Sequence, residues 1–167
     1  MALILLSGLP GTGKTTFARA LGDHLELAHV ESDAIRRGLA AEPTYSPHES
    51  GIVFARVEAE ARRALVEGRH ALIDATNLTN RDRRRFVRLA KETDARLIAV
   101  RLTVPEGVVR ERLAGPRHGN SQADLAVYEK MKGRPQPFPF PAVVVDTRWS
   151  LEPAIAFVLR LINDQAP

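Results

Sequence analysis

The strongest chemical signal in this sequence is a glycine-rich stretch near its start that fits the pattern G-x-x-x-x-G-K-[ST]. An apolar run precedes it and a helix-like spacing of apolar residues follows, which is the context in which such a stretch binds phosphate. The glycines let successive backbone N–H groups converge on phosphate oxygens, and the helix N-terminus adds partial positive charge. We therefore expect a nucleoside triphosphate to be held by Gly8, Gly11, Thr12, Gly13, Lys14, Thr15 and Thr16.

Two side chains of this stretch have distinct expected roles: Lys14 reaches the β- and γ-phosphates, and the Thr15 hydroxyl ligates Mg²⁺.

The absence of other motifs limits the class of nucleotide-using protein to which the chain can belong. A GTPase is expected to carry an Asn-Lys-x-Asp element and an Asp-x-x-Gly switch, and neither string occurs. A motor-type ATPase is expected to follow its metal-site aspartate with glutamate, whereas Asp74 is followed by Ala75. Phosphotransferases remain as the main class.

Asp33 and Arg36 are the candidate residues for the acceptor of the phosphoryl group. Asp33 follows the second apolar run, and Arg36 lies one helical turn further on the same side. A carboxylate there can accept the proton of an attacking hydroxyl, and the neighbouring arginine can hold an acceptor phosphate. Aspartate also caps helix N-termini well, so the residues alone leave a purely structural role for Asp33 equally open.

Alternating strands and helices must position these residues. The expected strands cover residues 2–6, 27–30, 71–73, 97–104 and 143–145, and each is nearly all apolar. The expected helices cover residues 13–25, 33–39, 49–67, 79–93, 105–113, 123–131 and 150–162, with Thr79 and Ser150 as N-caps. This order predicts an α/β fold, residues 1–167 forming a single domain around a parallel sheet covered on both faces. Ligands bind beyond the carboxyl ends of such strands.

The chain resembles the 5′-hydroxyl polynucleotide kinases of the bacterial RNA-repair and bacteriophage type. More broadly, it resembles the P-loop kinase group that includes tRNA kinases and zeta-toxin-like kinases. The resemblance extends from about residue 2 to about residue 132 and depends on four segments, residues 8–16, 32–39, 74–77 and 104–112. It implies a three-layer P-loop kinase fold with a five-stranded parallel sheet, helices on both faces and an arginine lid at about residues 114–123.

The resemblance also implies roles for individual residues. Asp33 matches the general base, and Arg36 matches an arginine that grips a phosphate of the acceptor strand. Arg112 and Arg117 match the lid arginines that, with the P-loop lysine, stabilise the transferring phosphoryl group. Arg117 needs a one-residue shift to do so, and Arg110 is a competing candidate.

Asp74 is a departure from the phage-type pattern, in which the aspartate directly precedes Thr-Asn. Here Ala75 intervenes, as in the bacterial type. This difference favours a water-mediated role for Asp74 at the metal over a direct one.

Composition sets the remaining limits. The chain has 167 residues, 26% of them charged, and no cysteine, which excludes disulfides, thiolate metal sites and cysteine nucleophiles. The apolar run at residues 2–6 is too short to span a bilayer and has no basic segment before it, so no export signal is visible and a cytoplasmic location without membrane contact is expected. Residues 1–75 carry a net charge of −2 and residues 76–167 a net charge of +6.

The basic run at residues 81–88 contributes much of that positive charge. On a helix its arginines spread around more than half of the circumference, so a solvated face is favoured over a nucleic-acid site. If the run does bind nucleic acid, it is expected to contact phosphates without sequence preference.

These observations predict an ATP- and Mg²⁺-dependent phosphotransferase. The leading acceptor is the 5′-hydroxyl end of a DNA or RNA strand, which would give Arg36 a phosphate to hold. One alternative is a small-molecule kinase acting on a nucleoside, sugar or antibiotic, and another is a non-catalytic nucleotide-binding module that hydrolyses ATP slowly. The nucleoside triphosphate and the acceptor are the expected partners, with no obligate protein partner evident.

Overall fold

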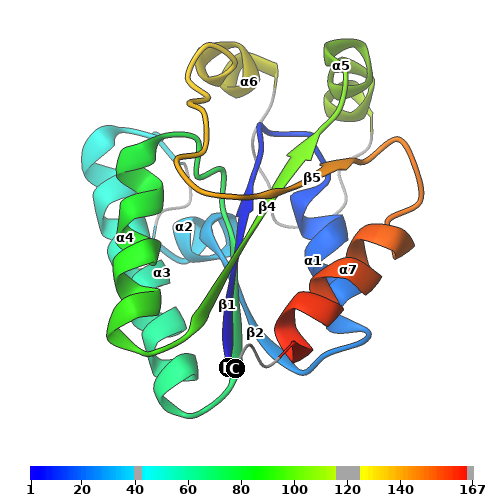
Figure 1. Ribbon diagram of the computed structural model, residues 1–167. Helices are drawn as coiled ribbons and strands as arrows, with labels where there is room; N and C mark the ends of the chain where they lie inside the picture. The colour runs from blue at the N-terminus through cyan, green and yellow to red at the C-terminus, as the bar shows by residue number, and fades with distance from the viewer. Residues whose placement is uncertain (40–42, 116–124, 165–167) are drawn as a thin grey trace.

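A single parallel sheet of five strands forms the centre of the molecule, in the order β2-β3-β1-β4-β5 (Figure 1). The computed structural model describes residues 1–39, 43–115 and 125–164. The strands are β1 (Ala2–Ser7), β2 (Leu27–Glu31), β3 (His70–Asp74), β4 (Arg96–Thr103) and β5 (Val143–Asp146). The prediction of a five-stranded parallel sheet is therefore confirmed.

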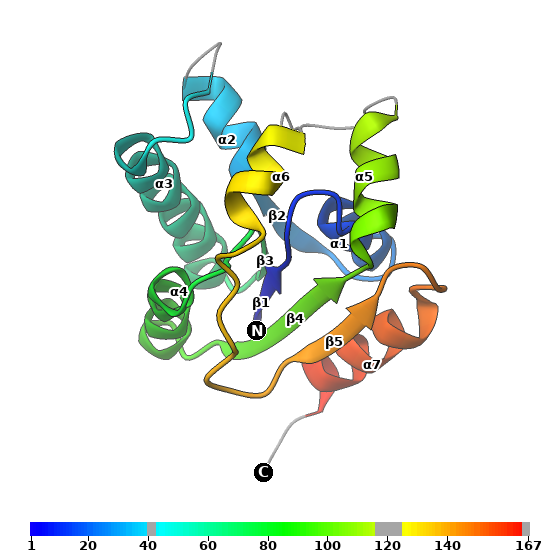
Figure 2. The same ribbon diagram turned by 90° about the horizontal axis from the view of Figure 1, so that it is seen from above.

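Seven helices surround the sheet among the described residues: α1 (Lys14–Gly22), α2 (Ser32–Leu39), α3 (Pro47–Val66), α4 (Asn80–Glu92), α5 (Glu106–Ala114), α6 (Leu125–Met131) and α7 (Glu152–Asn163). Helices α3 and α4 cover one face and α1 and α7 the other (Figure 2). Helices α5 and α6 lie at the end of the sheet toward which β4 points (Figure 1). In the described part of the chain, no helix is long and apolar enough to span a membrane.

The core consists of two apolar layers, one on each side of the sheet. Alternate residues of β1 enter different layers, because successive side chains of a strand point to opposite faces. Leu3 and Leu5 pack with α3 and α4, whereas Ile4 and Leu6 pack with α1 and α7. All four are fully buried, so β1 is covered on both sides, as its uninterrupted apolar sequence predicts.

The helix ends follow local rules with one exception. Thr79 and Asp82 form the predicted capping box at the start of α4. Ser46 caps α3 by accepting from the Glu49 N–H at 3.2 Å, with proline at the first helical position. The prediction for Ser150 is wrong: α7 has Leu151 as its N-cap and begins at Glu152, and the Ser150 hydroxyl only accepts a 3.3 Å hydrogen bond from the Glu152 N–H.

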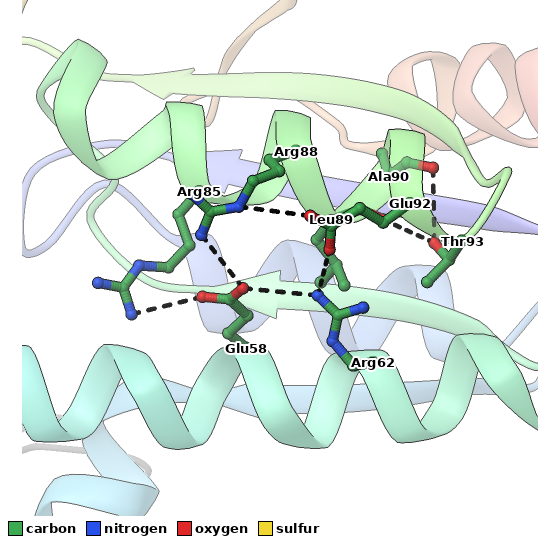
Figure 3. A network of polar contacts seen from close by, with 8 residues as sticks. All are labelled: Glu58, Arg62, Arg85, Arg88, Leu89, Ala90, Glu92 and Thr93. Carbon is green, nitrogen blue, oxygen red and sulfur yellow. Dashed lines mark hydrogen bonds and ion pairs between the residues drawn. The ribbon is translucent and has the colours of Figure 1, made fainter.

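A network of ion pairs joins α3 to α4 and accounts for part of the basic run (Figure 3). Glu58 of α3 lies 3.6 Å from Arg85 and 3.5 Å from Arg88 of α4. Arg62 of α3 lies 2.5 Å from Glu92 of α4. Arg85 and Arg88 of the basic run therefore join α4 to α3. The expectation of a purely solvated helix face did not include this role.

Arg83 departs furthest from that expectation, because it is the largest fully buried side chain among the described residues. Its guanidinium donates to the carbonyl oxygens of four residues at 2.9 Å, those of Asn77, Leu78, Gln136 and Pro137. It also lies 3.8 Å from the centre of the Phe138 ring. Burial, together with the like charge of Arg101, lowers its pKa from the ordinary value. Arg83 thus fastens the proline-rich connection before β5, residues 133–141, to the turn after β3.

Candidate active site

The phosphate-binding loop joins β1 to α1, and its glycines are required by geometry. Gly11 and Gly13 have φ angles of +80° and +87°, in the left-handed region that favours glycine. At Gly8 the limit is space, since a Cβ atom there would lie 2.5 Å from Thr12 Oγ1 and 2.8 Å from the Leu102 carbonyl oxygen. The predicted glycine positions are therefore each fixed by a specific constraint.

The two threonines flanking the core of the loop differ in their exposure. Thr12 is buried, and its hydroxyl donates to the Leu9 carbonyl oxygen at 2.8 Å, so it shapes the loop from inside. Thr16 is exposed and lines the cavity in front of the loop. Of these two predicted nucleotide ligands, only Thr16 presents its side chain to that cavity.

Lys14 is half-buried at the start of α1, with its ammonium group 3.1 Å from the Leu9 carbonyl oxygen. Desolvation lowers the pKa of Lys14, while the carboxylates of Asp74 and Asp33 act in the opposite direction. The ammonium group of Lys14 is therefore close enough to both aspartates to interact with their charges. A cation at the phosphate-binding loop is what binding of a polyphosphate requires.

Asp74, at the carboxyl end of β3, contacts Thr15 of α1 and His29 of β2. The Thr15 hydroxyl donates to Asp74 Oδ2 at 2.8 Å, and His29 Nε2 lies 3.1 Å from the same oxygen. Asp74 is almost fully buried and ends the strand that lies between β1 and β2. Sequence reasoning missed the contact between His29 and Asp74, which lie far apart in the chain and meet because β2 pairs with β3.

A cavity of about 420 Å³ brings the predicted groups together. Lys14, Thr15, Asp33, Asp74 and Arg112 all line it. The volume is within the ~300–1,000 Å³ usual for small-molecule sites. Helix α2 begins one residue before Asp33, which therefore lies in the first turn of the helix with its side chain at the cavity wall. The aspartate predicted as base and the phosphate-binding loop share one space.

Arg36 lies beside this cavity and not in its lining. The side chain is 6% exposed, forms an ion pair with Glu49 of α3, and lies 4.5 Å from the centre of the Tyr45 ring. Burial raises the pKa of Glu49, but hydrogen bonds from Thr44 and from Arg36 outweigh it and lower this pKa to about 2. The acceptor-binding role of Arg36 stays a prediction, since its guanidinium is engaged by a carboxylate here.

The structure separates the two lid arginines that compete on α5. Arg112 donates to the Gly11 carbonyl oxygen at 3.2 Å and to Thr147 Oγ1 at 2.9 Å, so its guanidinium lies directly on the phosphate-binding loop. Arg110 lies 2.6 Å from Glu106 and also pairs with Glu129 of α6. Of the two, Arg112 lines the cavity. Arg117 and most of the predicted lid at residues 114–123 lie outside the described residues.

Oxygen atoms that suit Mg²⁺ are present beside the loop. Mg²⁺ prefers oxygen ligands and is usually held by one or two protein groups together with substrate phosphates. The Thr15 hydroxyl and the Asp74 carboxylate, 2.8 Å apart, fit that donor set. The described residues contain no cluster of three or more His, Asp or Glu side chains able to hold a metal ion by themselves.

Two known proteins are similar in sequence to most of this chain. An uncharacterized protein of Mycobacterium tuberculosis is 27% identical over 144 residues, which cover 79% of this chain and 29% of that protein. The L-seryl-tRNA(Sec) kinase of Methanococcus maripaludis is 27% identical over 150 residues, which cover 87% of this chain and 59% of that protein. The chain thus spans less than a third of the first relative and somewhat over half of the second.

Solved structures share the fold at low identity. Kti12 of Chaetomium thermophilum, in complex with ADP-AlF3, has a TM-score of 0.77 at 20% identity, covering 96% of this chain and 98% of that one. The APS kinase CysC of Mycobacterium tuberculosis, in complex with AMPPNP and APS, has a TM-score of 0.70 at 16% identity, covering 98% of each. The sequence model of the AAA_33 family, described as an AAA domain, matches residues 3–138. The chain therefore belongs to the AAA_33 family and has the α/β P-loop kinase fold.

Proposed function

We propose that this protein is an ATP- and Mg²⁺-dependent phosphotransferase that moves the γ-phosphoryl group to an acceptor hydroxyl. One observation carries the proposal: Asp33 lines the same cavity as Lys14 and the phosphate-binding loop. A module that only bound or slowly hydrolysed the nucleotide would not need a second carboxylate facing the loop from another strand end. The kinases among its relatives and structural neighbours support the same class of reaction.

Each of the chain's own groups has a defined task in this proposal. Backbone N–H groups of the loop and the ammonium of Lys14 hold the phosphates, and Arg112 adds charge where it develops on the transferring group. Asp33 accepts the proton of the acceptor hydroxyl as that oxygen bonds to phosphorus. When bound, Mg²⁺ held by the Thr15 hydroxyl, with Asp74 acting on it through water, would supply further charge neutralisation at the phosphates. Catalysis of this kind is mostly positioning and electrostatic stabilisation.

The 5′-hydroxyl end of a polynucleotide is the acceptor we favour, because the motifs at residues 32–39 and 74–77 resemble those of polynucleotide kinases. A small-molecule acceptor is the second candidate. The cavity volume of about 420 Å³ suits a compact substrate, and one structural neighbour is an APS kinase.

A transfer assay with labelled ATP tests the proposal. The acceptors are 5′-hydroxyl DNA and RNA oligomers, nucleosides and simple sugars, each at several salt concentrations. We expect label in the oligomers, and we expect Asp33→Asn to lower kcat by about 10²–10⁴ while the Kd for ATP stays the same. Transfer only to small acceptors would select the second candidate. Stoichiometric ATP binding with no transfer to any acceptor, or full activity of the Asp33→Asn variant, would overturn the assignment.

A further inference from the structure

A second cavity of about 370 Å³ adjoins the first on the side of α6. One wall is the segment before α3, and the other is α6 with the residues that follow it. Its lining consists of Pro43, Thr44, Tyr45, Ala126, Val127, Lys130, Met131 and Arg134. Three of these residues, Tyr45, Val127 and Met131, also line the first cavity, so the two spaces share a wall that is apolar apart from the tyrosine hydroxyl.

Among the described residues that line this side cavity, the charged side chains are both cations, Lys130 and Arg134. Lys130 and Arg134 are both exposed, and no carboxylate of the described residues forms an ion pair with either. Lys132 differs, since it lies 2.7 Å from Glu129 and 3.6 Å from Glu106. Among the described residues, Lys132 is thus neutralised by acidic side chains, whereas the two cations that line the cavity have no ion-pair partner.

Behind the opposite wall, the carboxylate of Glu49 does not cancel this charge. Glu49 accepts hydrogen bonds from the Thr44 N–H at 2.7 Å and the Thr44 hydroxyl at 2.5 Å, but its charge is balanced by Arg36. In the described part of the chain, an anion entering between Thr44 and α6 therefore meets Lys130 and Arg134, with a neutral pair behind the opposite wall. Arginine and lysine side chains at such a place are typical phosphate ligands.

Tyr45, at the junction of the two cavities, has an unusual backbone. Its φ angle is +52°, a conformation that costs a non-glycine residue of this size energy and that concentrates at ligand-binding sites. The ring is held against the guanidinium of Arg36, 4.5 Å from the ring centre. The strained residue thus fixes an aromatic surface between the space in front of Asp33 and the cations of the side cavity.

We propose that the side cavity is a phosphate-binding subsite for the acceptor, with Lys130 and Arg134 as its ligands. The inference depends on the proposed function and deepens it: the acceptor is a phosphorylated compound whose hydroxyl faces Asp33. Its uncharged part lies against Tyr45, Val127 and Met131, and its phosphate extends toward the end of α6. Such a phosphate belongs either to a nucleic acid strand or to a small metabolite.

Binding and kinetics together test this subsite. The protein is saturated with AMP-PNP to occupy the phosphate-binding loop, and calorimetry then measures the Kd of adenosine 3′-monophosphate, a 5′-hydroxyl tetradeoxynucleotide and ribose 5-phosphate. Adenosine and ribose serve as uncharged counterparts. The variant is Lys130→Ala with Arg134→Ala, and the matched control is Lys132→Ala, directly after α6 in the chain.

We expect at least one phosphorylated probe to bind, and the double variant to weaken it by at least about tenfold, as the loss of charged hydrogen bonds implies. The Kd for AMP-PNP and for the uncharged counterpart should be unchanged, and Lys132→Ala should behave as wild type. Binding of the nucleotide probes or of ribose 5-phosphate identifies the source of the phosphate. Equal binding by wild type and double variant, or no binding of any phosphorylated probe, overturns the subsite.

The transfer assay keeps this outcome separate from the proposed function. If transfer occurs and the double variant raises the acceptor KM at constant kcat, both inferences stand. If transfer occurs with an unchanged acceptor KM, the subsite is wrong and the phosphotransferase assignment is not. If no transfer occurs to any acceptor, the proposed function fails, and the binding measurement still decides whether the side cavity holds phosphate.

Discussion

Replacing Arg83 by methionine should lower the unfolding free energy by about 3 kcal/mol, the net loss expected for two buried charged hydrogen bonds at ~1.5–3 kcal/mol each. The two are those to the carbonyl oxygens of Asn77 and Leu78, residues that are 0% and 5% exposed. Neither oxygen is orphaned, because the first still accepts from Ser7 Oγ at 3.0 Å and the second from the Gln136 N–H at 2.9 Å. Part of this loss is offset because the methionine variant no longer has to bury a positive charge, which costs desolvation free energy.

The other contacts of Arg83 change the balance little. The carbonyls of Gln136 and Pro137 belong to exposed residues, so water can replace the guanidinium there. Methionine keeps an apolar contact with the Phe138 ring in place of the cation, at a difference of ~1 kcal/mol or less. The expected loss of stability therefore comes from the two buried hydrogen bonds to Asn77 and Leu78, in the turn that follows Asp74.

Urea denaturation followed by circular dichroism measures this cost. With an m-value of about 2 kcal/mol/M, a loss of about 3 kcal/mol lowers the midpoint by roughly 1.5 M. Arg84→Met is the control, because Arg84 is the exposed neighbour on the same helix and should change stability by no more than ~0.5 kcal/mol. Midpoints of the two variants within about 0.25 M of each other would refute the reasoning.

Three further predictions concern the site. Gly8→Ala places a Cβ atom 2.5 Å from a side chain and 2.8 Å from a backbone oxygen, so ATP affinity should fall by at least about tenfold, whereas Gly22→Ala, with open space around it, should bind ATP normally in the same calorimetric titration. Arg112→Ala should lower kcat by about 10³ or more and Arg110→Ala should leave it nearly unchanged; similar kcat values for the two would contradict the assignment. The pKa of Glu49 is lowered from 4.5 to about 2, so the stability that its carboxylate contributes is complete above pH 4.5 and is lost as the pH falls toward 2. Acid titrations of unfolding free energy should show a smaller loss over that range for Glu49→Gln than for wild type, and parallel curves would disprove the pairing.

Much of the fold could be predicted because its signals are local. The five strands are short and apolar, and the helices alternate with them, which leaves a parallel sheet covered on both faces as the natural solution. The capping box at Thr79 is likewise contained within four residues. Ser150 shows the limit of such local rules: a serine near a helix start hydrogen-bonds the chain whether or not the helix begins directly after it.

The arginines could not be sorted by the same means. Arg83, Arg84 and Arg85 are consecutive, yet one is buried, one is exposed and one faces Glu58 of another helix. Helix geometry gives the angle between neighbouring side chains, but which angle points to the sheet depends on how α4 packs. The proline-rich connection that accepts two of the hydrogen bonds of Arg83 lies more than fifty residues away in the chain.

The sequence by itself determined the phosphate-binding loop, because the glycines, Lys14 and Thr15 act through a backbone shape formed by consecutive residues. It also determined the parallel sheet, whose strand ends carry the candidate aspartates. Only the tertiary structure decided which separated residues meet: that Asp74 contacts Thr15, that Arg112 and not Arg110 lies on the loop, and that Arg36 is paired with Glu49. Those contacts depend on the docking of whole helices on the sheet, and docking is set by long-range packing that spacing along one chain does not encode.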